Sequence, residues 1–278
     1  MKVVKFGGSS VANAEQISKV IDIVASDADR RIVVVSAPGK RCSDDTKVTD
    51  LLIALGESVL ENKDYGAALQ HVVSRYAEIQ QALGLPEDVV ADIEADLRDR
   101  IESRGEHLLQ FMDEMKAAGE DNNAKIIAAA FAAKGHAARY VNPGEAGMLL
   151  SDEFGNAEVL PESYEKLAAL KNESDIIVFP GFFGSTRSGE VATFPRGGSD
   201  ITGAILAAAV KADVYENFTD VDSVYAMDPR IMPDAPAIEI MTYHELRELA
   251  YAGFGVFHDE AIIPAVLAGI PICIKNTN

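Results

Sequence analysis

The sequence predicts an α/β fold, a three-layer α/β/α sandwich in which helices cover both faces of a mostly parallel central sheet. The main observation is alternation, because short runs rich in β-branched residues are separated by segments with helical spacing of apolar residues. A second observation is the unbroken run Ile32–Val35, which is typical of a strand buried on both faces of a parallel sheet. Such sheets bind ligands at the carboxyl ends of their strands, so the segments that follow each run are the candidate sites.

The expected strands share a run of β-branched or aromatic residues, and several of these runs end at glycine or proline. In chain order they are 3–6, 31–36, 137–141, 175–179, 191–194, 214–218 and 271–275. Gly7-Gly8 ends the first strand and Pro38-Gly39 ends the second. We expect 191–194 to form half of a hairpin with the strand before it.

The expected helices share apolar residues at helical spacing or a high content of small residues. They are 17–24, 46–60, 123–134, 161–170, 200–211, 243–252 and 260–268. Residues 64–118 are rich in charges at helical positions, typical of a solvated helix surface. We expect this region to be a helical excursion that covers one face of the sheet and offers an interface.

Charge and cysteine content narrow the class of protein. A chain of 278 residues with 48% hydrophobic content is ordinary for one or two globular domains. The net charge of −19 argues against nucleic acid or an anionic membrane as a partner. The two cysteines form neither a disulfide framework nor a metal set, which favours a cytoplasmic location, and no apolar stretch is long enough to predict a membrane span.

Residues 5–10, Lys-Phe-Gly-Gly-Ser-Ser, follow the first strand and suit a phosphate. Gly7 and Gly8 expose backbone N–H groups, the next helix points its N-terminus at the anion, and Lys5 adds a point charge. The alternative is a tight strand-to-helix turn whose lysine faces solvent. The segment is not a Walker A loop, which occurs nowhere in this sequence.

Two further segments are expected just before helices. Arg196 begins residues 196–200, where its guanidinium can grip a carboxylate in bidentate fashion, or the segment can simply cap a helix. Glu120, within 118–121, can receive a substrate ammonium, or it can only favour the dipole of the helix that follows.

Thr219 and Asp220 end an expected strand, and Tyr225 and Arg230 follow in the next loop. A strand-end acid with a nearby aromatic ring and arginine suits a nucleotide, whereas the alternative is an acidic loop held by turn hydrogen bonds. The five histidines show no metal-ligand spacing, so we expect them to be structural and predict no metal-ligand set.

Taken together, these segments resemble the aspartate kinases (aspartokinases) of the amino acid kinase family, and the resemblance covers essentially the whole chain. It rests on residues 5–10, 47–52, 119–120, 180–182, 196–200 and 219–230. It implies a carbamate kinase-like fold and one catalytic domain, residues 1–278, with an amino-acid lobe at about 1–198 and a nucleotide lobe at about 199–278. It also allows a homodimer.

The resemblance implies that ATP, with Mg²⁺, phosphorylates the side-chain carboxylate of L-aspartate to give 4-phospho-L-aspartate, the first step towards lysine, threonine and methionine. It makes Lys5 and Asp200 the catalytic residues. Because a carboxylate nucleophile is already ionised, Asp200 would organise Lys5 or the substrate ammonium and would not accept a proton. The implied binding residues are Gly7, Gly8 and Ser9 for the phosphoryl group, Thr49, Glu120, Phe182, Arg196, Gly198 and Ser199 for aspartate, and Thr219, Asp220, Tyr225 and Arg230 for the nucleotide.

The sequence departs from the family pattern in two places. Many members carry a lysine where this chain has Gly255, and we hypothesise that Lys40 or Arg41 supplies the missing charge. The chain also stops where the family's regulatory ACT domains would begin, so we expect those domains, and feedback inhibition through them, to be absent.

Two alternatives stay open. One is a kinase of another amino acid such as glutamate, since Arg196 with Glu120 favours a free α-amino acid over carbamate or UMP. The other is a nucleotide-binding sensor that has lost catalysis, which Gly255 suggests and the retention of Lys5 and Asp200 opposes.

Overall fold

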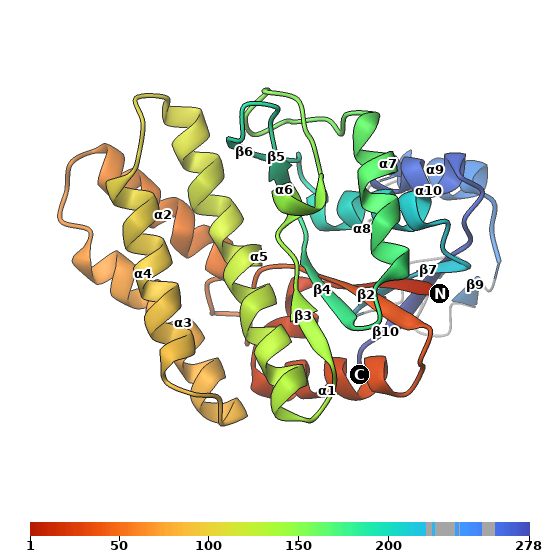
Figure 1. Ribbon diagram of the computed structural model, residues 1–278, viewed down its shortest axis with the longest axis horizontal. Coiled ribbons are helices and arrows are strands. Elements are labelled where there is room, and N and C mark those ends of the chain that lie inside the picture. Colours follow the sequence, from red (N-terminus) through yellow and green to blue (C-terminus); the bar gives the residue numbers. More distant parts are fainter. Residues whose placement is uncertain (221–223, 226–236, 239, 252–258) are drawn as a thin grey trace.

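The computed structural model describes residues 1–220, 224–225, 237–238, 240–251 and 259–278 (Figure 1). Its core is a six-stranded sheet with the order β10-β7-β1-β2-β4-β3, and every pairing in it is parallel. The strands are β1 (Lys2–Phe6), β2 (Arg30–Val35), β3 (Ala138–Tyr140), β4 (Ile176–Pro180), β7 (Val214–Thr219) and β10 (Ile272–Asn276). The predicted parallel α/β fold is confirmed.

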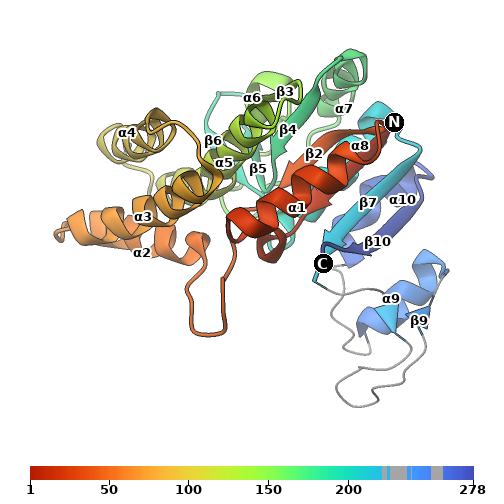
Figure 2. The ribbon, with the colours of Figure 1, turned by 90° about the horizontal axis from the view of Figure 1, so that it is seen from below.

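Helices pack on both faces of this sheet, which makes the three layers of the sandwich. Successive strand residues point to opposite faces, so Val4 belongs to one hydrophobic core and Val3 to the other. The first core is covered by α1 (Ala14–Ala25) and α5 (Leu108–Ala133), and the second by α7 (Glu162–Leu167), α8 (Gly198–Val210) and α10 (Ile263–Leu267). Figure 2 shows α1 and α8 on opposite sides of β2.

The remaining described elements are short or peripheral. They are the helices α2 (Val48–Leu60), α3 (Gly66–Leu83), α4 (Asp88–Glu102), α6 (Pro143–Ala146) and α9 (Tyr243–Tyr251), the 3₁₀ turns η1 (Gly8–Val11), η2 (Ala168–Asn172) and η3 (Asp259–Ile262), and the strands β5 (Phe183–Ser185), β6 (Val191–Thr193), β8 (Val224–Tyr225) and β9 (Ala237–Ile238). Most predicted boundaries fall within two residues of these.

The helix-rich excursion builds an outer layer on one side of the molecule. Its last helix, α5, packs on β3 and β4. The helix α3 packs on α1, α2 and α5, and α4 packs on α3 and α5. Figure 1 shows α3 and α4 beyond α5, away from the strands. The excursion therefore covers a sheet face through α5, and its use as an interface stays a prediction.

The prediction that residues 118–121 precede a helix is wrong, because they lie in the middle of α5. A glycine there weakens the helical signal. The structure gives the reason for it: a Cβ built on Gly119 would lie 2.9 Å from the Cβ of Ala37 and 3.2 Å from a methyl of Leu52. Gly119 thus lets α5 approach the segment after β2, and this packing outweighs its low helix propensity.

The prediction that 191–194 pairs with the strand before it, 175–179, is also wrong. β4 is flanked by β2 on one side and β3 on the other, so it has no free edge for a hairpin. Instead β6 pairs antiparallel with β5, a strand that we did not predict.

None of the described helices is long and apolar enough to cross a membrane. Strands from both predicted lobes lie side by side in one sheet, since β7 pairs directly with β1. The division into an amino-acid lobe and a nucleotide lobe stays a prediction.

Candidate active site

The loops that follow β1, β2, β4, β7 and β10 meet at one edge of the sheet, because parallel strands end on the same side. Backbone hydrogen bonds join neighbouring loops there: Gly7 N–H donates to the Phe218 carbonyl at 3.1 Å, and Gly181 N–H donates to Val35 at 2.9 Å. The carboxyl edge therefore brings together segments from both ends of the sequence.

Lys5 and Asp200 form the ion pair at the centre of this edge. Lys5 is only 7% exposed, and its Nζ lies 2.8 Å from Asp200 Oδ1. Asn217, which is in register with Lys5 on the neighbouring strand, donates its Nδ2 to the same oxygen at 2.5 Å. Of the two roles left open for Asp200, the structure places it as a partner of Lys5.

The Gly7–Gly8 turn begins η1 directly after β1. A Cβ built on Gly7 would lie 3.6 Å from Lys5 Nζ, so the lysine ammonium lies close to the turn. Ser9 is exposed, whereas Ser10 is buried and shares a hydrogen bond of 2.7 Å with Thr277. This arrangement places a cation beside the glycine turn, and the binding of a phosphate there stays a prediction.

Phe182, Gly198 and Ser199 lie close together where β4 ends and α8 begins. Phe182 has a φ of +77°, a left-handed conformation that is rare for a residue with a side chain. Its N–H donates to Thr202 Oγ1 at 3.0 Å, and its ring packs against Gly198. Strained backbone of this kind is often held at binding sites, so we infer a functional constraint here.

Glu120 lies on α5 beside the segment after β2, where the Ala37 N–H contacts its carboxyl group. It is 6% exposed, and its Oε2 has no hydrogen-bond partner among the described residues. Burial raises the pKa of Glu120 to about 8, although the Ala37 N–H opposes the shift. Because Glu120 lies in mid-helix, the interpretation that it serves a helix N-terminus is wrong, and a buried acceptor that suits an ammonium donor remains.

The structure does not link the other predicted aspartate-binding residues to this group. Arg196 is exposed and has no ion-pair partner among the described residues, and Thr49 is half-buried in the first turn of α2. Neither shares a hydrogen bond with Lys5 or Glu120 in the described part of the chain.

The predicted nucleotide residues are only partly covered. Thr219 and Asp220 lie at the end of β7, where Thr219 Oγ1 donates to Asp220 Oδ1 at 3.0 Å. Tyr225 belongs to β8, and Arg230 lies outside the described residues, as does Gly255. Among the described residues, no group of three His, Cys, Asp or Glu side chains is placed to hold a metal ion.

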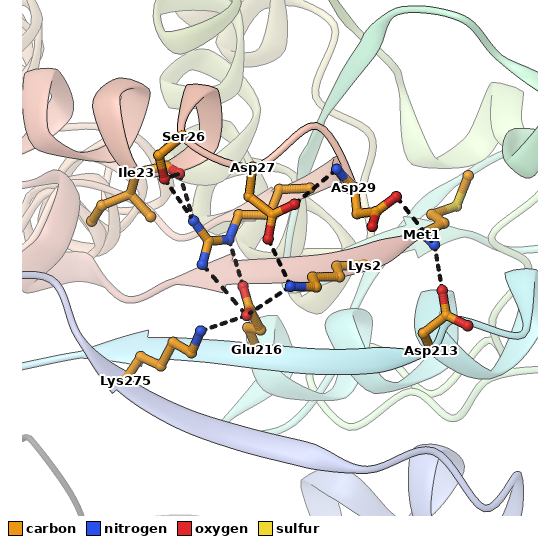
Figure 3. A network of polar contacts seen from close by, with 10 residues as sticks. Met1, Lys2, Ile23, Ser26, Asp27, Asp29, Asp213, Glu216 and Lys275 are labelled. Atoms are coloured by element: carbon orange, nitrogen blue, oxygen red, sulfur yellow. Dashed lines mark hydrogen bonds and ion pairs between the residues drawn. The ribbon is translucent and has the colours of Figure 1, made fainter.

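Sequence reasoning missed Asn217 and Asn123. Asn123, on α5, donates to the Ser36 carbonyl at 2.7 Å and ties α5 to the loop after β2. The signal for Asn217 was available, because Glu216 and Asn217 are consecutive polar residues in a buried central strand. Glu216 points to the opposite face, where Arg30, Lys275 and Lys2 surround it (Figure 3).

The comparison with known proteins identifies the family of this chain. The family model described as "Amino acid kinase family" matches residues 1–276. The chain belongs to the amino acid kinase family. Aspartokinase 3 of Bacillus subtilis is 54% identical over 278 residues, covering 100% of this chain and 61% of that protein. The chain thus spans about three fifths of the length of that relative.

Solved structures of the amino acid kinase family agree over the whole chain. A Clostridium acetobutylicum aspartate kinase is 37% identical with a TM-score of 0.87, covering 100% of this chain and 60% of that one. An Escherichia coli aspartokinase III, solved in complex with aspartate and ADP, is 28% identical with a TM-score of 0.81, covering 100% and 62%. The sequence resemblance to this family is confirmed.

Proposed function

We propose that this chain is an aspartate kinase catalytic domain, which transfers the γ-phosphoryl group of ATP to the side-chain carboxylate of L-aspartate and gives 4-phospho-L-aspartate. The observation that carries the proposal is the buried Lys5, held by Asp200 at 2.8 Å beside the Gly7–Gly8 turn. The 54% identity to Bacillus subtilis aspartokinase 3 supports this activity, and the likeness to a structure with aspartate and ADP supports the substrates. The reaction would be the first step towards lysine, threonine and methionine.

The reaction needs no general base, because the attacking carboxylate of aspartate is ionised at neutral pH. What it needs is in-line placement of two anions and relief of their repulsion. Lys5 would neutralise the transferring phosphoryl group, and Gly7, Gly8 and Ser9 would line it. Because the Gly7 N–H is already bonded to the Phe218 carbonyl, the N–H donors would be those of Gly8 and Ser9. Asp200 and Asn217 would keep the Lys5 ammonium aimed at that position.

The aspartate would be held from several elements around the same edge. Glu120, with its unpartnered Oε2, would accept the substrate ammonium, and Arg196 would pair with the α-carboxylate. Thr49, Phe182, Gly198 and Ser199 would complete the pocket. An incoming ammonium lowers the pKa of Glu120 from about 8, so binding of aspartate would ionise this carboxyl.

The nucleotide would lie over Thr219 and Asp220, with Tyr225 and Arg230 as further contacts. Mg²⁺ that arrives with the nucleotide fits this edge, because Asp200 and Asp220 offer carboxylates and Mg²⁺ takes most of its remaining ligands from phosphates and water. When bound, the ion would neutralise charge on the phosphates.

Lys40 and Arg41, in the loop after β2, are the two candidates to replace the positive charge that many family members carry at the position of Gly255. Their contacts distinguish them. Arg41 is committed elsewhere, since its Nε lies 2.9 Å from Asp45 Oδ2 and it also pairs with Glu78. Lys40 has no carboxylate partner among the described residues. These contacts favour Lys40 as the replacement cation.

The test is ATP- and Mg²⁺-dependent acyl-phosphate formation, trapped with hydroxylamine, with L-aspartate and L-glutamate compared side by side. We expect turnover with aspartate and little with glutamate. Preference for glutamate would move the assignment to a sister kinase, and ATP binding without turnover on either would support a sensor. The homodimer and the cytoplasmic location stay predictions.

A further inference from the structure

Arg75 is a buried arginine that none of the roles above uses. It lies on α3 in the outer helical layer and is only 4% exposed. A buried guanidinium is costly unless its N–H groups find acceptors, so its partners indicate what the side chain does.

The partners of Arg75 are mostly the two ends of one loop, which lies between α1 and α2 in Figure 2. Its Nη1 donates to Asp45 Oδ2 at 3.0 Å and to the Thr46 carbonyl at 2.8 Å, and its Nη2 donates to the Gly39 carbonyl at 2.9 Å. Nη2 also lies 3.4 Å from the Ala12 carbonyl, just after η1. One planar side chain therefore joins both ends of the loop to the segment after β1.

This loop packs directly on the phosphate-binding turn. Gly39 N–H donates to the Gly8 carbonyl at 2.9 Å, and a Cβ built on Gly39 would lie 2.6 Å from the Gly8 carbonyl carbon. The two backbones are therefore hydrogen-bonded to each other and packed so closely that no side chain fits at position 39. A displacement of Gly39 would displace Gly8, and the Arg75 guanidinium is what holds the Gly39 carbonyl from outside.

Asp45 completes the arrangement from within the loop. It accepts hydrogen bonds from the backbone N–H and Nε of Arg41, both at 2.9 Å, in addition to the bond from Arg75. The loop is thus closed by two arginines on one carboxylate. Lys40, between Gly39 and Arg41, is the loop cation that has no carboxylate partner in the described part of the chain.

We propose that Arg75 is a positioning residue for the nucleotide phosphates: it holds the loop 39–46 against Gly8, so that the turn and Lys40 meet the same phosphates. The proposal rests on the proposed function, because it requires that the turn binds ATP. Arg75 itself lies on the outer layer and would not touch the nucleotide.

The experiment compares Arg75→Lys with the wild-type protein. Lysine keeps the charge but cannot span four acceptors with a fixed fork. We expect about tenfold weaker binding of a non-hydrolysable ATP analogue with Mg²⁺ by calorimetry, and much less change for AMP, which lacks the outer phosphates. Hydrogen exchange should become faster at residues 8–12 and 37–47.

The matched control is Arg30→Lys. Arg30 is also largely buried, and its guanidinium makes a bidentate contact with Glu216 that lysine cannot make. It contacts neither the loop 39–46 nor the Gly7–Gly8 turn. It should lower the melting temperature and leave the dissociation constant of the analogue unchanged. Asp45→Asn serves as a second loop variant should Arg75→Lys fail to fold.

Equal affinity for the analogue in the wild type and in the loop variants would overturn the positioning role. Weaker binding without faster exchange in the loop would overturn it as well. A wild-type protein that binds no ATP analogue would overturn the proposed function, and this inference with it.

Discussion

Two neighbouring residues of β7, Glu216 and Asn217, belong to two ionic clusters on opposite faces of the sheet. On the α1 face, the Glu216 carboxylate forms ion pairs with Arg30 Nε at 2.7 Å and with Lys275 Nζ at 2.6 Å (Figure 3). Lys2 Nζ lies 3.8 Å from the same carboxylate. On the α8 face, Asn217 and Lys5 share one oxygen of Asp200.

The Glu216 cluster and the carboxyl edge of the sheet differ in what they leave unsatisfied. Burial alone would raise the pKa of Glu216, but Arg30 and Lys275 hold it below its ordinary value. The site edge instead keeps an unpartnered acceptor on Glu120 and an unpaired cation on Arg196 within the described residues. The first cluster is complete without a ligand, and we infer that it stabilises the fold. The site edge is not complete in this way, and we propose that Glu120 and Arg196 gain their partners from the substrate.

The largest expected effect is a loss of activity on substitution of Lys5, which belongs to the cluster on the α8 face. Lys5→Met should lower kcat/KM by about 10³-fold, because it removes the cation that would neutralise the transferring phosphoryl group. The loss is measured with the hydroxylamine assay at saturating ATP. The melting temperature should change little, since Asn217 still donates to Asp200; a variant that keeps wild-type turnover would rule out the role of Lys5.

Glu120→Gln tests the unpartnered acceptor of the site edge through two measurements, the KM for aspartate and the pH dependence of stability. We expect the KM for aspartate to rise about 100-fold while affinity for the ATP analogue is unchanged, because a buried charged contact to the ammonium is lost.

The pH dependence of stability follows from the pKa of Glu120, which burial raises from its ordinary value of 4.5 to about 8. Between these values the folded state binds a proton that the unfolded state has lost, so unfolding free energy falls as pH rises through this window. Glu120→Gln should flatten that slope in urea titrations at several pH values. A slope identical to wild type would contradict the shift.

Glu216→Ala tests the other cluster. The substitution leaves Arg30 and Lys275 without the carboxylate that they share, so we expect the unfolding free energy to fall by about 2 kcal/mol. The loss is not larger because the Lys275 side chain is partly exposed and can bind water. Because the pKa of Glu216 is lowered, its contribution is present above its unfolded pKa and is lost as pH falls through the lowered value. Urea unfolding measures the loss, and kcat of the remaining folded protein should stay near wild type.

Asn217→Ala has the smallest expected effect. Asp200 would keep Lys5 but lose its second donor, so we expect about a tenfold lower kcat and about 1 kcal/mol less stability. Steady-state kinetics together with urea unfolding measure both. A stability loss with unchanged kcat would place Asn217 with the structural cluster of Glu216.

The sheet and most of its helices could be predicted because buried parallel strands such as Ile32–Val35 have a continuous apolar pattern. The pairing of Lys5 with Asp200 could only be proposed from the motifs, since nothing local in the sequence indicates that the start of α8 packs on β1. Glu120 was predicted in the wrong local structure, because Gly119 suggested a helix boundary that tertiary packing overrides, and its role towards a substrate ammonium stays a prediction. Arg75 gives no signal, since its partners are mostly backbone carbonyls that any sequence could offer.

The place of β1 in the sheet bears on the order of folding. β1 lies between β2 and β7, and Lys2 pairs with Val214 far along the chain. Such distant pairing is slow, because the chain loses the conformational entropy of a long loop before the strand contact stabilises it. During synthesis β1 can pair with β2 early, but Lys5 must wait for Asp200 and Asn217 to leave the ribosome. The proposed capacity for phosphoryl transfer would therefore appear late and abruptly, when β7 joins the sheet.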